Sequence, residues 1–345
     1  MKAQINVMTV LMLLFLGACT STPLGKRATG LAYEVVVTME ADGWEGDAGQ
    51  ALKNDLQAPV SGLPQAEPSM RITYATPENF NGLLTYVKNI VIINTDPTRY
   101  TKVSLSAERD HWADGQLILT VNCPDNAALQ QYLEEHPRVL VNLFTREEMS
   151  RGMRLLETDY NRDVSARLNE MLNVTLNIPA AMTTAKPGEN FFWCTNDAPT
   201  GRTDIVVYTF PYRDANTFTP EYLVAKRDSV MKINVPGSFP DSYMTTETRY
   251  IVPDYKAIML NDRYCGVLRG LWRMQGDMMG GPFVSHVRLD EDNQRVVVAE
   301  AFVYAPETDK RNYMRRAESA LYTLRLPGDG MRLPEIRVMP GRENE

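Results

Sequence analysis

The sequence predicts an α+β fold in which mostly antiparallel sheets carry flanking helices, arranged as two halves of similar structure. From residue 31 to about residue 326, helical and strand periods alternate without a polar low-complexity break. Each half shows a strand, a helix, several mostly sequential strands and a helix, which is typical of this fold class. With 345 residues, 44% of them hydrophobic and 23% charged, the chain is long enough for one or two hydrophobic cores.

The N-terminal half is expected at residues 31–171. Short runs of β-branched and aromatic residues predict its strands, and Asp125 is a good N-cap for one of its helices. A capping box at residues 145–148 predicts the start of a long helix that ends at residue 171. Well before these helices, residues 63–68 are expected to form a connector, since three prolines between 59 and 68 disfavour helix and central strand alike. The expected strands are 33–39, 70–74, 89–94, 101–108 and 116–122, and the first helix is 44–56.

The C-terminal half is expected at residues 172–326. Pro220 suits the first position of a helix that runs to about residue 231, and a final helix covers residues 310–324. The expected strands are 174–178, 190–194, 205–210, 243–252, 256–260, 264–274, 282–289 and 295–304. Residues 327–345 are rich in Pro and Gly and predict a poorly ordered tail.

The first residues predict an export signal with a lipid anchor. Lys2 precedes an apolar run from residue 5 to residue 16, which is too short to span a bilayer. The sequence Leu16-Gly17-Ala18-Cys19 resembles a bacterial lipobox, and a plain secretory signal is the alternative. We therefore expect a signal peptide at residues 1–18, acyl chains such as palmitate on Cys19 and a tether at residues 19–30.

Catalytic and nucleic-acid-binding signatures are missing from the sequence. It has no phosphate loop, dinucleotide fingerprint, nucleophile elbow or zinc-protease motif. Its net charge of −7 disfavours nucleic acid as a partner. The three histidines suit structural or surface roles, and neither a metal nor a cofactor is expected. Cys123, Cys194 and Cys265 are read as buried thiols, with one disulfide among them as the alternative.

The most unusual segment runs from residue 269 to residue 284. Strand alternation would place Arg269 and Arg273 on one face and Trp272 on the other. The two arginines could clamp an anion or pair with carboxylates such as Glu300. The cations of Lys310 and Arg311 oppose the dipole of the helix they begin, which implies some other partner for them. The candidate ligand-binding residues are Arg269, Trp272, Arg273, Gly280, Gly281, Phe283, Lys310 and Arg311.

These same residues resemble the signature of an uncharacterised lipoprotein family of Bacteroidota, catalogued as a domain of unknown function. The resemblance rests on residues 269–272, 279–283, 302–306 and 310–311, together with 63–68 in the N-terminal half. It implies a lipoprotein from that phylum and no assigned activity. Because no acidic run follows Cys19, we expect the protein to be anchored in the outer membrane and to face the periplasm.

The sequence therefore predicts a membrane-anchored, non-catalytic protein for binding or envelope maintenance. Its expected partners are the membrane, through Cys19, and either an envelope protein or a small anionic ligand. The alternatives are an envelope hydrolase that acts on glycan or peptide, which requires two carboxylates in a cleft, and a subunit of a larger lipoprotein assembly.

Overall fold

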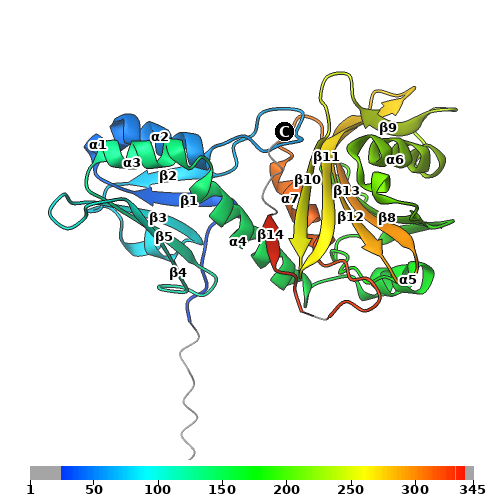
Figure 1. Ribbon diagram of the computed structural model, residues 1–345, viewed down its shortest axis with the longest axis horizontal. Coiled ribbons are helices and arrows are strands. Elements are labelled where there is room, and N and C mark those ends of the chain that lie inside the picture. The colour runs from blue at the N-terminus through cyan, green and yellow to red at the C-terminus, as the bar shows by residue number, and fades with distance from the viewer. Residues whose placement is uncertain (1–24, 331, 339–345) are drawn as a thin grey trace, which may run out of the picture.

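The computed structural model describes residues 25–330 and 332–338, which form two domains side by side (Figure 1). The predicted signal peptide (1–18) and Cys19 lie outside the described residues. Within the described part, no helix has both the length and the apolar character needed to cross a membrane.

The N-terminal domain is a five-stranded sheet with helices on one face. Its strands lie in the order β2-β1-β3-β5-β4, and only the edge strand β4 runs antiparallel to its neighbour. In Figure 1, helices α1, α2 and α3 lie together over the sheet, and α2 and α3 share a hydrophobic core with it. The elements are β1 (Glu34–Thr38), α1 (Ala41–Glu45), α2 (Asp47–Leu56), β2 (Arg71–Ala75), the 3₁₀ helix η1 (Gly82–Tyr86), β3 (Asn89–Thr95), β4 (Ser104–Arg109), β5 (Leu117–Cys123) and α3 (Asn126–Glu135).

The C-terminal domain is a larger antiparallel sheet buried on both faces. Its strand order is β14-β10-β11-β12-β13-β8-β7-β6, and β9 pairs with β11. Helix α6 packs on one face and helices α5 and α7 on the other. The elements are α5 (Arg162–Leu172), β6 (Thr184–Gly188), β7 (Phe191–Thr195), β8 (Arg202–Pro211), η2 (Ala215–Phe218), α6 (Pro220–Asn234), β9 (Tyr243–Glu247), β10 (Asp254–Leu260), β11 (Arg263–Gln275), β12 (Gly280–Asp290), β13 (Arg295–Tyr304), α7 (Arg311–Leu321) and β14 (Ile336–Val338).

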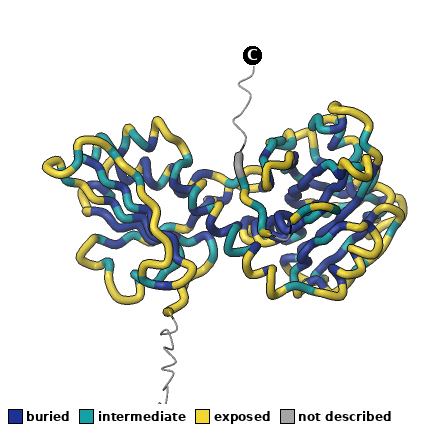
Figure 2. Tube along the Cα trace, turned by 60° about the horizontal axis from the view of Figure 1, so that its bottom comes forward, coloured by how far each residue is buried: buried dark blue, intermediate teal, exposed yellow. Residues whose placement is uncertain are grey.

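Helix α4 (Val139–Leu156) belongs to both domains. Its first turns place Leu140 and Phe144 in the N-terminal core, and its last turns place Met153 and Leu156 in the C-terminal core. At Gly152 the helix approaches α7 so closely that a Cβ atom would lie 2.6 Å from the Ser319 hydroxyl. One continuous helix packed in two cores couples the domains, and buried backbone continues through their junction (Figure 2).

The predicted α+β class is confirmed, and most strand pairs are antiparallel. The expected similarity of the two halves is wrong, because three of the strand pairings in the N-terminal sheet are parallel whereas the C-terminal sheet is antiparallel throughout. The continuous apolar run 90–93 in β3 suits a parallel strand, which is buried on both faces.

Two helix boundaries in the middle of the chain differ from the prediction. The expected helix 145–171 is two helices, α4 and α5, and α5 packs in the C-terminal core instead of ending the first half. Helix α4 begins before the expected capping box because its cap comes from elsewhere. The carboxylate of Asp55 accepts a hydrogen bond of 2.9 Å from the backbone amide of Val141. Asn161 caps α5 by accepting from the amide of Val164.

Other differences concern segments at the edges of the sheets. Residues 174–178 make isolated backbone contacts instead of a strand, and β6 was not predicted. The tail 327–345 is not without structure, because β14 pairs with β10. The tether predicted at 19–30 is docked on the N-terminal domain from residue 26 onward, as the amide of Ala28 donates to the carbonyl of Asp114 at 2.9 Å.

Candidate functional site: the cleft between the domains

A cleft of about 510 Å³ opens where the two domains meet. Residues 60–63 and α4 line it from one side, and β10, β11, β12 and α7 from the other. Apolar side chains such as Met149, Val267 and Met314 form part of its wall. Its charged lining residues are the cations Arg138, Arg146, Lys256, Arg269 and Arg315 and the carboxylates Asp254 and Glu318.

Arg269 of β11 and Glu318 of α7 form a bidentate salt bridge at the wall of the cleft. The Nη1 atom of Arg269 donates to Oε2 of Glu318 at 2.8 Å, and Nη2 donates to Oε1. Burial alone would raise the pKa of Glu318, but the charge of Arg269 and the hydrogen bonds to the carboxylate together outweigh it and hold that pKa well below its usual range. Glu318 is therefore an ionised carboxylate at neutral pH.

Two further side chains surround the same carboxylate. The hydroxyl of Tyr322 donates to Oε1 of Glu318 at 3.2 Å. His286 is fully buried, and its Nε2 lies 3.8 Å from that oxygen, too far for a hydrogen bond. Burial lowers the pKa of His286 below its ordinary value, so this histidine is neutral at pH 7. This places His286 in a structural role, as the sequence indicated.

The remaining cations give the cleft an excess of positive charge. Arg146 is exposed, and the described part of the chain gives it no ion pair. Lys256 lies 3.3 Å from Asp254, but the lysine is exposed and the aspartate partly exposed, so the pair leaves the lysine available. Arg315 is buried, donates to the Ser69 carbonyl at 2.9 Å and lies 4.3 Å from the centre of the Tyr33 ring. The cleft therefore combines apolar wall residues with unneutralised cations at accessible positions.

The structure separates the predicted ligand-binding residues onto two faces of one sheet. Arg269 lies on the cleft face, whereas Trp272 lines a smaller pocket of about 180 Å³ on the other face. Phe283 touches the cleft lining but packs in the same core as Trp272. Arg269 forms its pair with α7, whereas Trp272 packs in the core under α6, so the predicted strand alternation holds. Arg273 pairs with Glu247 at 3.3 Å and takes no part in the cleft. Both arginines pair with carboxylates, as expected.

Glu300, the carboxylate suggested as a partner for Arg269 and Arg273, pairs with neither of them, so that prediction is wrong. Glu300 is fully buried and accepts from Arg227 of α6 at 2.8 Å and from Ser285 at 2.6 Å. The guanidinium of Arg227 also lies 3.9 Å from the centre of the Phe283 ring. This network fastens α6 to the sheet.

Gly280 and Gly281 allow neighbouring strands to pack closely. A Cβ atom on Gly281 would lie 2.0 Å from the carbonyl oxygen of Val303, and that oxygen accepts from the indole of Trp272 at 3.2 Å. A Cβ on Gly280 would lie 3.0 Å from the carbonyl oxygen of Trp272. Both glycines permit close strand packing and lie outside the cleft lining, so their prediction as ligand-binding residues is not supported.

Lys310 and Arg311 find their partner inside the protein. The carboxylate of Glu67 accepts hydrogen bonds of 2.8 Å from the backbone amides of both residues, at the N-terminus of α7. The guanidinium of Arg311 donates to the carbonyl of Pro68. The backbone amides of both residues and the guanidinium of Arg311 therefore attach α7 to the proline-rich connector, whereas the ammonium of Lys310 donates to the carbonyl of Thr308 in its own loop.

Sequence analysis missed the cations that surround the cleft. Arg138 is the N-cap of α4 and Arg146 lies on the same helix, whereas Lys256 belongs to β10 of the other domain. The one sequence signal for the junction was Glu67, an acidic residue between prolines. It is buried in the structure, and a buried carboxylate needs a hydrogen-bond partner.

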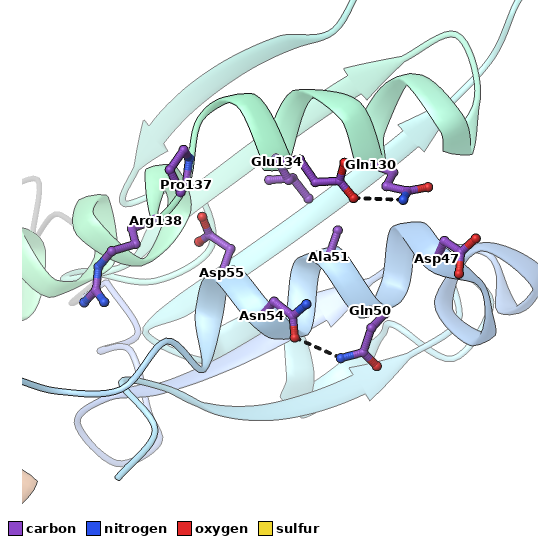
Figure 3. A pocket seen from close by; sticks show the side chains of 10 residues that line it. Asp47, Gln50, Ala51, Asn54, Asp55, Gln130, Glu134, Pro137 and Arg138 are labelled. Carbon is purple, nitrogen blue, oxygen red and sulfur yellow. Dashed lines mark hydrogen bonds between the residues drawn. The ribbon is translucent and has the colours of Figure 1, made fainter. Parts of the chain in front are cut away.

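A second concave site lies between α2 and α3, with a volume of about 300 Å³ (Figure 3). Its amides bond along their own helices: Gln50 donates to Asn54 at 2.9 Å, and Gln130 donates to Glu134 at 2.8 Å. Asp55, also on its wall, caps α4. These polar groups serve the helices, and Asp47 and Arg138 also line the site.

The three thiols are free and buried, so the alternative of a disulfide is not supported. Burial raises the pKa of the Cys265 thiol to about 12 and raises those of Cys123 and Cys194. None of them is a nucleophile at neutral pH. In the described part of the chain, no group of His, Cys, Asp or Glu could hold a metal ion.

Comparison with known protein families gives two matches that follow the domain boundary. Residues 28–157 match a domain of unknown function (DUF8532), and residues 161–323 match another domain of unknown function (DUF4837). The boundary falls between α4 and α5, and the predicted resemblance to an uncharacterised domain family is confirmed. No curated protein matches the chain.

Proposed function

Because both domains of this chain belong to families of unknown function, we propose its role from the chemistry of the cleft. The protein is an outer-membrane lipoprotein anchored through Cys19 and facing the periplasm. It binds, without catalysis, an amphipathic anion between its two domains. The lipobox supports the anchor, and the observation that carries the binding role is a cleft with apolar walls and five cations against two carboxylates.

The ligand is an anion because the cleft is positive in a protein whose net charge is −7. Arg269 and Glu318 neutralise each other, which leaves Arg138, Arg146 and Lys256 to meet a charged head group. A guanidinium donates two parallel hydrogen bonds to a carboxylate or phosphate. The apolar residues of the wall provide contact for a hydrocarbon part.

The hydrolase alternative needs a carboxylic acid that can donate a proton. Glu318 does not suit that role, because Arg269 holds its pKa below the usual range and so keeps it ionised. Asp254, the other carboxylate of the lining, is partly exposed and lies 3.3 Å from Lys256. The two carboxylates of the cleft, Glu318 and Asp254, therefore favour a binding role over glycan or peptide hydrolysis.

A fluorescent polyunsaturated fatty acid and its uncharged methyl ester test the proposal. We expect saturable binding of the acid and much weaker binding of the ester. Arg146→Gln should lower the affinity for the acid by about tenfold, because a charge-assisted hydrogen bond contributes about 1.5 kcal/mol. The matched control is Arg213→Gln, an exposed arginine outside the cleft lining. Equal binding of acid and ester, or equal effects of the two substitutions, would contradict the proposal.

A further inference from the structure

The first described residues of the chain are attached to the N-terminal domain. The amide of Thr29 donates to the carbonyl of Tyr86 at 2.7 Å, and the amide of Asp114 donates to the carbonyl of Lys26 at 2.8 Å. The ammonium of Lys26 also donates to the Tyr86 hydroxyl at 2.8 Å. Residues 26–29 of the expected tether are therefore attached to the domain.

This attachment limits how far the domain can lie from the lipid. Seven Cα to Cα steps separate Cys19 from Lys26. A fully extended chain spans at most about 3.5 Å per residue, which gives a reach of about 25 Å. The acyl chains insert into the bilayer, so the edge of the domain that holds residues 26–29 must lie near its surface.

Exposed apolar side chains gather at that edge. Leu83 is 85% exposed and Leu31 is 64% exposed, which is unusual for large aliphatic residues. Leu83 lies in η1, whose residue Tyr86 bonds the docked segment, and Leu31 follows that segment directly. Trp112 is partly exposed in the next loop and meets the Phe80 ring edge-on at 5.8 Å. Leucine and tryptophan are side chains that favour a membrane interface.

Charge at this edge is mixed. Lys26 and Arg27 are exposed cations, and the exposed carboxylate of Asp114 lies beside them next to Gly25. Glu108 lies 2.7 Å from the His111 ring, and Asp110 accepts from the amide of Gly115 at 2.6 Å. The surface therefore favours contact with a bilayer through its apolar side chains rather than through a particular head group.

We propose that this edge, formed by Leu31, Leu83 and Trp112 around residues 26–29, is the surface that lies on the membrane. The inference rests on lipid attachment at Cys19, which belongs to the proposed function. It adds an orientation, because the amino ends of β1, β3 and β5 then face the bilayer. This edge contacts the lipid surface itself, because the short tether holds the domain close to the bilayer.

Site-directed fluorescence on the acylated full chain tests this orientation. Leu83→Cys and the control Ile233→Cys, which is 78% exposed on α6, are each labelled with an environment-sensitive dye. The proteins are placed in vesicles of phosphatidylethanolamine and phosphatidylglycerol that contain a spin-labelled lipid quencher. We expect quenching several-fold stronger at position 83 than at position 233. Equal quenching at both positions would overturn the orientation.

A second comparison tests the apolar contact, with the dye kept at position 83. Leu31→Glu should reduce the quenching, whereas Leu155→Glu, at a 60% exposed position of α4, should leave it unchanged. Equal effects of the two substitutions would overturn the contact. Mass measurement of the acyl chains comes first, since a chain without them would overturn the anchor and the orientation together. Failure of the anchor is thus distinguishable from failure of the orientation and from failure of ligand binding.

Discussion

Glu67 offers the sharpest test of how the two domains are joined. Its carboxylate is buried, and its two oxygens accept one hydrogen bond of 2.8 Å each from the amides of Lys310 and Arg311. The favourable charge at the N-terminus of α7 strengthens both bonds. Glu67→Ala removes both acceptors at once and leaves two donors without partners in the junction.

The size of the effect follows from these contacts. Loss of a helix cap costs about 1–2 kcal/mol, and leaving a buried donor unpaired costs about 1–3 kcal/mol. We therefore expect Glu67→Ala to lower the free energy of unfolding by about 3 kcal/mol. Glu67→Gln keeps one amide oxygen as an acceptor and should cost about half as much. For a domain of this size, a loss of 3 kcal/mol lowers Tm by about 6–12 °C.

Urea unfolding followed by circular dichroism measures the change. The matched control is Glu78→Ala, an exposed glutamate of the same domain. A loss below about 0.5 kcal/mol for Glu67→Ala, comparable to that control, would refute the reasoning. It would mean that Arg315 and the packing of α4 hold the junction without Glu67.

Three further outcomes follow from buried groups. Glu318→Gln should cost about 3–5 kcal/mol at pH 7, because it leaves Arg269 unpaired. Since the folded-state pKa of Glu318 is depressed, its contribution is present above about pH 4.3 and is lost as the pH falls below that value. In urea unfolding, the difference between the two proteins should therefore begin to shrink below about pH 4.3 and still be present at about pH 3, and parallel curves would contradict this. Gly281→Ala should destabilise by about 2 kcal/mol in thermal unfolding, whereas Gly330→Ala, with no atom within 4 Å of its Cβ, should be neutral; similar values would argue against the close contact with Val303. A thiol reagent should leave the folded acylated protein unmodified and titrate three thiols in urea, and a count of one would reveal a disulfide among Cys123, Cys194 and Cys265.

The elements that could be predicted from the sequence are those with a local cause. Asp125 caps its helix as expected, accepting from the amide of Ala128, and Pro220 begins α6 as expected. The alternation of Arg269 and Trp272 across β11 follows from the two-residue period of a strand.

The features that the sequence did not reveal depend on partners far along the chain. Helix α4 starts where Asp55 caps it, 86 residues earlier. Arg269 binds Glu318 and not Glu300, because α7 covers one face of the sheet and α6 the other. Arg138 and Arg146 of α4 meet Lys256, Arg269 and Arg315 of the C-terminal domain only when the domains pack, so the cleft as a whole is not indicated by local spacing.

Binding of an amphipathic anion in the interdomain cleft can be located directly by NMR of the methionine methyl groups. Met149 and Met314 line the cleft, whereas Met244, Met274 and Met279 line the smaller pocket on the other face of the sheet. Titration with a fatty acid should shift the signals of Met149 and Met314 in a saturable way and leave the other three unchanged. Shifts confined to the smaller pocket, or no saturable shift at Met149 and Met314, would contradict the proposed function.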